Sequence, residues 1–219
     1  NGWLNVFKEQ GYTSSHIVRT LKKKFNIKKI GHYGTLDPLA SGVLPLALGE
    51  ATKTIQFINF TQKSYSFFIN WGKETDTCDK AGKVLRETNI RPNIAEIKQT
   101  IKKYFMGNID QTPPIFSAVK VNGKRAYQLA RKNEKFEINS KKIKIINFEL
   151  LRLINKNKAQ FSVRCGPGTY VRSLARDLSK KLGTLGYASN IVRLKNSYFC
   201  ISRSISFEKI VKSNIQNFY

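Results

Sequence analysis

The sequence predicts an α+β fold, because strand and helix patterns alternate along its 219 residues without a regular strand–helix–strand repeat. At 41% hydrophobic and 24% charged residues, the chain has enough apolar side chains to form a packed core, and disorder is not expected. Since domains commonly hold about 100 to 200 residues, its length corresponds to one large domain or two small ones.

The first half of the chain begins with a short apolar strand at 3–7. Thr13 or Ser14 can cap the next helix, whose apolar residues recur at the spacing of one helical face: Ile17, Val18, Leu21 and Phe25. Three further segments are a glycine- and proline-rich stretch, a helix and an alternating strand, at 31–49, 50–57 and 63–71.

The second half carries two predicted helices and two long strands. Residues 93–105 place four apolar side chains on one helical face, and Pro92 falls in the first turn, which tolerates proline. The other three elements are two strands joined by a polar turn and a final helix, at 141–153, 159–165 and 169–182.

Charge is the first functional signal. The chain has 39 Lys and Arg residues against 14 Asp and Glu, a net charge of +25. An excess of this size destabilises a compact protein by self-repulsion, so a polyanionic partner is expected to compensate it. Nucleic acid is favoured and an acidic membrane surface comes second, whereas a general lysine-rich composition is the alternative that involves no partner.

The cysteines and histidines argue against a metal. Cys78, Cys165 and Cys200 lie far apart, and neither His16 nor His32 has ligand spacing to them. No phosphate-binding or dinucleotide-binding glycine motif occurs. No apolar run approaches the roughly 20 residues of a membrane-spanning helix. We therefore expect a cytoplasmic protein with no membrane-spanning helix and no metal site.

The most informative segment runs from Gly31 to Pro45. Pro38 keeps Asp37 out of the helical region, so the carboxylate is held on an extended, stiff backbone. Such a loop can present one carboxylate beside a polyanion. Asp-Pro is also a common turn dipeptide, and the spacing alone leaves both interpretations open.

This segment, followed by Gly49-Glu50-Ala51-Thr52-Lys53, resembles the signature G-H-x-G-x-L-D-P-L-A-x-G-x-L-P of the TruB family of tRNA pseudouridine synthases. Further matches follow in order along the chain: Lys63-Ser64-Tyr65, Thr75-Asp76-Thr77 with Asp79 and Gly82, Gln111-Thr112-Pro113-Pro114 with Ser117-Ala118, Gly123-Lys124 with Ala126-Tyr127, Gly168 to Ser173, and Val192-Arg193-Leu194.

The resemblance implies the pseudouridine synthase fold, with a mixed, mostly antiparallel central sheet. It implies that a T-loop uridine of tRNA, position 55, is flipped out of its stack and isomerised without a cofactor. The catalytic domain is expected to span 1–205, with an RNA-contacting insertion at about 105–140, and to act on the tRNA T-arm as a monomer. The family's PUA-like domain is expected to be absent, because only a short segment, 206–219, follows.

Three residues match the family's reactive set. Asp37 matches the nucleophile that attacks C1′ or the base, Tyr65 the tyrosine that stacks on the uracil, and Arg172 the arginine paired with the catalytic carboxylate. Without the family, Tyr65 would be an aromatic on one face of a strand, and Arg172 part of a solvated basic helix face.

Four more residues match substrate-binding positions. Tyr170 and Ile191 correspond to pocket residues, with isoleucine where leucine is common, and His32 to a histidine that packs against the disrupted T loop. Lys8 corresponds to the lysine of an N-terminal segment in which Glu9 replaces the usual proline. Tyr33 replaces a threonine beside His32 and adds bulk there.

Two other functions remain open at this point. A guide-RNA-dependent synthase of the H/ACA type shares the catalytic domain, but it needs partner proteins and a PUA domain. A non-catalytic tRNA-binding or folding chaperone could keep the fold and the basic surface; the presence of Asp37, Tyr65 and Arg172 argues against it.

Overall fold

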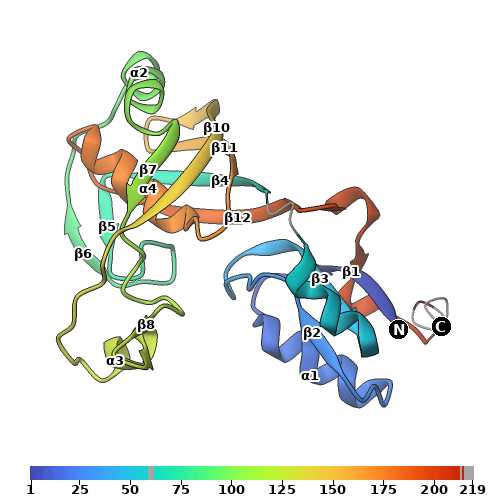
Figure 1. Ribbon diagram of the computed structural model, residues 1–219. Coiled ribbons are helices and arrows are strands. Elements are labelled where there is room, and N and C mark those ends of the chain that lie inside the picture. The colour runs from blue at the N-terminus through green and yellow to red at the C-terminus, as the bar shows by residue number, and fades with distance from the viewer. Residues whose placement is uncertain (59–61, 213, 215–219) are drawn as a thin grey trace. The chain divides into compact units, whose positions relative to one another are not determined.

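The computed structural model describes residues 1–58, 62–212 and 214. The chain forms two compact units: Asn1–Tyr65 with Asn190–Tyr219, and Ser66–Ser189 (Figure 1). It passes from one unit to the other within β4 (Lys63–Trp71) and within β12 (Gly186–Asn196). Helices flank a mixed sheet, so the predicted α+β class is confirmed.

The sheet of the first unit is built around a single buried strand. β3 (Ser41–Leu48) is buried at every position after Ser41. It pairs antiparallel with β1 (Gly2–Lys8) and β2 (Ile30–His32) and parallel with β12. Two short strands complete this sheet: β13 (Phe199–Cys200) on β12 and β14 (Ile205–Ser206) on β1.

Helical segments cover this sheet in the first unit. α1 (Ser14–Lys24) begins where Thr13 caps the amide of His16, as predicted, and buries Ile17 and Leu21. Two short 3₁₀ helices, η2 (Ile201–Arg203) and η3 (Phe207–Lys209), flank β14 near the end of the chain. The predicted segment 206–219 therefore begins inside this unit; its residues 213 and 215–219 lie outside the described chain, and the boundary at 205 stays a prediction.

A helix is present at the predicted position, 50–57, and it is of the tighter 3₁₀ type. Gly49–Phe57 forms a 3₁₀ helix, η1, with no buried residue. Within it, the Thr52 and Thr54 hydroxyls each donate to the carbonyl three residues back, at 2.8 Å.

The sheet of the second unit places β4 beside β11 (Lys158–Cys165), then β10 (Lys141–Asn155) and β7 (Gly107–Gln111), with both β10 pairings antiparallel. Its core is aromatic: the Phe161 ring lies 5.8 Å from Phe67 and 5.7 Å from Phe148. A separate hairpin consists of β5 (Lys73–Thr75) and β6 (Val84–Glu87).

Two helices flank this sheet. α2 (Ile94–Tyr104) begins with a capping box between Asn93 and Glu96, so Pro92 lies before the cap and not in the first turn. α4 (Val171–Lys181) follows β11 and is buried along most of one side.

Residues 112–140 leave the sheet of the second unit between β7 and β10 (Figure 1). This excursion carries the short strands β8 (Lys120–Val121) and β9 (Lys124–Arg125), which pair with each other, and the helix α3 (Ala126–Arg131). It covers most of the insertion expected at about 105–140.

Replacing Phe161 with Ala should lower the free energy of unfolding by about 3–5 kcal/mol, because it leaves a cavity among stacked aromatic rings. The matched control is Leu151→Ala on the neighbouring strand β10, where the side chain is 50% exposed. Urea unfolding measures both. A similar small change in the two variants would contradict the central place of Phe161 in the core.

Candidate active site

Asp37 lies in a loop whose main chain is held on both sides of it. The Leu36 amide donates to Ser14 Oγ at 2.9 Å, and the same hydroxyl donates back to the Leu36 carbonyl at 3.1 Å. The Pro38 carbonyl accepts from the Gly11 amide at 2.8 Å. Asp37 itself is half-buried. The carboxylate is therefore presented from a fixed backbone, as the Asp-Pro sequence predicts.

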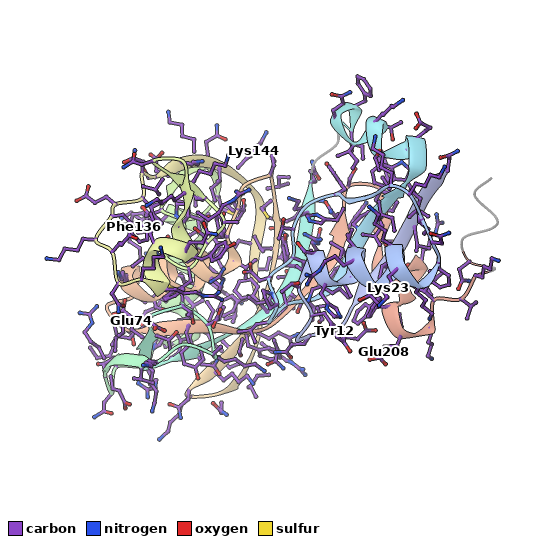
Figure 2. All side chains as sticks on the ribbon, turned by 90° about the horizontal axis from the view of Figure 1, so that it is seen from below. Tyr12, Lys23, Glu74, Phe136, Lys144 and Glu208 are labelled. Atoms are coloured by element: carbon purple, nitrogen blue, oxygen red, sulfur yellow. The ribbon has the colours of Figure 1, made fainter. Side chains whose placement is uncertain are left out.

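Lys8 lies under this loop and is completely buried. Its ammonium donates to the carbonyls of Glu9 at 3.0 Å, Tyr12 at 2.8 Å and Pro38 at 3.4 Å. Tyr12 is fixed in turn: its ring stacks on His16 and meets the edge of Phe207, so Tyr12 and the segment of Glu208 lie side by side in Figure 2.

Burial dominates the protonation equilibrium of Lys8. Desolvation and the nearby Arg193 charge lower its pKa from 10.5 to about 8, while the carboxylates of Asp37 and Glu9 act in the opposite direction. The effect of Asp37 on this pKa indicates that the two predicted site residues are close enough for their charges to interact.

His32, Tyr65 and Ile191 also belong to the first unit. Burial, and then the Arg193 charge, lower the pKa of His32, so its ring is neutral at pH 7. Tyr65 is 7% exposed on β4 and Ile191 is 5% exposed on β12. The ring of Tyr33, next to His32, is perpendicular to that of Trp3, with 6.3 Å between the ring centroids.

Arg172 lies in the second unit and is buried, contrary to a solvated helix face. Its guanidinium donates to the carbonyls of Thr77 at 3.1 Å and Phe116 at 3.2 Å, and it pairs with Asp79 Oδ2 at 3.6 Å. The other Asp79 oxygen accepts from the Thr77 hydroxyl at 2.6 Å and the Ala81 amide at 3.0 Å. The loop around Asp79 thus holds the guanidinium in a fixed position.

Tyr170 precedes the first turn of α4 in the second unit and is held by the side chain of Gln111. The Gln111 amide group donates to the Tyr170 carbonyl at 3.1 Å and accepts from its amide at 2.8 Å. The Thr112 carbonyl accepts from Ser173 Oγ, also at 2.8 Å. The Gln-Thr pair thus fixes the start of the helix that carries Arg172.

The seven predicted site residues are divided between the units. Lys8, His32, Asp37, Tyr65 and Ile191 belong to the first, and Tyr170 and Arg172 to the second. Within the first unit, the structure brings Lys8 and Asp37 together.

Three further residues of the site, Asp79, Gln111 and Arg193, are not identified by sequence reasoning. All three are buried polar residues. In the sequence, only their position within the family motifs could have indicated a role.

Across the described ranges, no group of three or more His, Cys, Asp and Glu side chains could hold a metal ion. In the same part of the chain, no helix is both long and apolar enough to cross a membrane.

The sequence matches the family described as TruB family pseudouridylate synthase (N terminal domain) over residues 22–171. It is 46% identical to tRNA pseudouridine synthase B of Wolbachia pipientis subsp. Culex pipiens, over 98% of this chain and 61% of that protein. The protein of the same name from Ehrlichia ruminantium is 42% identical, over 95% of this chain and 71% of its own length.

Among solved structures, a chain of a Cbf5-Nop10-Gar1 complex superposes with a TM-score of 0.72 and 29% identity, over 94% of this chain and 52% of that one. A chain of an H/ACA RNP bound to a substrate RNA containing 2′-deoxyuridine gives 0.70 and 26%, over 94% and 51%. The chain thus spans about half of these solved chains and 61% of the Wolbachia relative.

The free energy of unfolding should rise with pH between about 8 and 10.5, the folded and ordinary pKa values of Lys8. In this range the unfolded chain holds the Lys8 proton that the folded chain has lost, so deprotonation favours folding by up to ~3 kcal/mol. Urea unfolding at several pH values measures the slope. Lys8→Met should remove this contribution and Lys23→Met, at an exposed lysine of α1, should keep it; equal slopes in all three proteins would contradict the prediction.

Proposed function

The chain belongs to the TruB family of pseudouridylate synthases, and on this premise we propose that it isomerises the T-loop uridine of tRNA, position 55, to pseudouridine. The observation that carries the proposal is the half-buried Asp37, whose loop is anchored on both sides of the carboxylate. Incubation with an unmodified tRNA transcript, followed by mapping of pseudouridine, tests it directly.

The proposed reaction breaks the bond between N1 of uracil and C1′ of the ribose and forms a bond between C5 and C1′. The C5 proton leaves and N1 gains one, so no atom is lost and no oxidant or cofactor is consumed. Because the reacting atoms are inaccessible in a stacked base, the uridine must first be flipped out, at a cost of a few kcal/mol.

Asp37 is the proposed nucleophile. A carboxylate is ionised at neutral pH and needs no separate base to activate it. Tyr65 is proposed to stack on the flipped uracil and to help remove the C5 proton. Tyr170 and Ile191 are proposed to line the base pocket, and neutral His32 to pack against the opened T loop.

Basic residues support a tRNA substrate. The net charge of +25 favours a partner with a phosphate backbone, because each neutralised phosphate releases counterions. The excursion at 112–140 carries exposed Lys120, Lys124 and Arg125, and we propose that it contacts the T-arm. A tRNA substrate also implies action in the cytoplasm, and we propose that the protein works as a monomer.

A guide-RNA-dependent synthase is the second candidate, because the solved chains with TM-scores of 0.70 and 0.72 come from H/ACA-type complexes. Those chains are 26% and 29% identical, whereas the curated tRNA pseudouridine synthases named above are 42% and 46% identical. The difference supports action on tRNA without a guide. Pseudouridine formed only when a guide RNA is added would favour the second candidate.

Asp37→Asn should abolish pseudouridine formation and leave tRNA binding nearly unchanged, because an amide has the shape of the carboxylate but cannot act as the nucleophile. Asp110→Asn, at an exposed position of β7, is the control and should keep full activity. Near-normal activity of Asp37→Asn would contradict the proposed mechanism. Unaltered protein that binds tRNA without modifying it would instead point to a chaperone.

Arg172→Lys should slow the single-turnover reaction on the order of 10²-fold while tRNA affinity changes little. Lysine keeps the charge but loses the planar fork, which donates here to two carbonyls and faces Asp79. Arg164→Lys, at an exposed arginine of β11, controls for loss of a surface guanidinium. If Arg172→Lys weakens binding and keeps the single-turnover rate, Arg172 is a phosphate contact and not part of the reactive set.

A further inference from the structure

Arg193 on β12 is completely buried, and all three of its hydrogen-bond acceptors are main-chain carbonyls. Its Nε donates to Val43 at 2.7 Å, and its two terminal nitrogens donate to Thr35 at 3.1 Å and Gly34 at 2.9 Å. A buried guanidinium is costly unless its donors are satisfied. These carbonyls therefore determine where the side chain can lie.

The acceptors lie at both ends of one segment, residues 34–43, which we name the Asp37 loop. Gly34 and Thr35 precede Asp37, and Val43 follows it on β3. We call the part before Asp37 and the part after it the two limbs of the loop. Since the guanidinium is planar and its donors point in fixed directions, one side chain sets the distance between these limbs.

Cross-strand register places a second cation beside the first. Gly42 of β3 is opposite Lys8 of β1 and opposite Arg193 of β12. Residues directly opposite each other point to the same face of a sheet, so both cations reach that face. Lys8 bonds to the Pro38 carbonyl in the middle of the loop, whereas Arg193 holds its two ends.

Gly42 fixes the approach of β12 to the loop. Its φ is +110°, and an added Cβ would come 2.2 Å from the Arg193 carbonyl oxygen. The main chain at Arg193 therefore lies directly against Gly42, and a side chain at position 42 would separate β3 from β12.

We propose that Arg193 is a positioning residue for the reaction, which fixes the separation of the two limbs of the Asp37 loop and so aims the carboxylate at the substrate. It does not contact the substrate itself. The inference rests on the proposed function, because it assigns Arg193 a part in the chemistry of Asp37 and not in tRNA binding.

Arg193→Lys is the first test, because lysine keeps the charge but cannot bond to both limbs. The thermal unfolding midpoint of each variant is measured first. Single-turnover rates at saturating enzyme and tRNA affinity are then measured at a temperature below that midpoint. We expect the rate to fall on the order of 10²-fold and the affinity to change by less than about threefold. Arg203→Lys, at an exposed arginine of the same unit, should keep the rate.

Chemical rescue is the second test and separates positioning from general stabilisation. Free guanidinium ion should restore part of the lost rate to Arg193→Ala, whereas methylammonium should not. The unfolding midpoint of Arg193→Ala should not rise when guanidinium is added, which shows that the rate is not restored through stability. A folded Arg193→Lys variant with the rate of the unaltered protein would overturn the inference while leaving the proposed function intact. Absence of pseudouridine with the unaltered protein would overturn both.

Discussion

The beginning of β3 depends on two buried cations that face the same side of the sheet. Lys8 and Arg193 stand opposite Gly42 from its two neighbouring strands, and neither is exposed. Charges removed from water persist only where hydrogen bonds and opposite charge replace hydration. Main-chain carbonyls supply the hydrogen bonds, and Asp37 supplies negative charge nearby. Burial of the cations and the fixed conformation of the loop are therefore consequences of the same interactions.

The second unit uses a related arrangement with a different charge balance. Arg172 also donates to two loop carbonyls, but it faces the carboxylate of Asp79, which is itself held by a hydroxyl and an amide. The Asp79 carboxylate, 3.6 Å from the guanidinium, adds an ion pair to the two carbonyl bonds, which the Arg193 guanidinium does not have among its carbonyl acceptors. In both units most of the acceptors belong to irregular segments, with Val43 of β3 as the exception, so buried cations give these loops a defined geometry.

Local patterns were sufficient for the regular elements and insufficient for these arginines. Alternating residues predict β4, and apolar residues at three- and four-residue spacing predict α2. On its own helix Arg172 has the pattern of a solvated basic residue, yet it is 5% exposed. Its acceptors lie 95 and 56 residues away, at a distance that no periodicity reaches. The role of Asp37 likewise came from the family motif, because Asp-Pro alone also fits an ordinary turn.

The net charge of +25 therefore combines two kinds of basic residue with different physical consequences. Exposed lysines such as Lys23 remain hydrated, repel one another and are relieved by a polyanion, so they contribute to affinity. Buried cations such as Lys8 and Arg193 have lost hydration and are already satisfied within the fold. They can offer nothing to a phosphate without leaving their carbonyls. Binding and positioning are thus carried by separate residues, and a change in one group need not disturb the other.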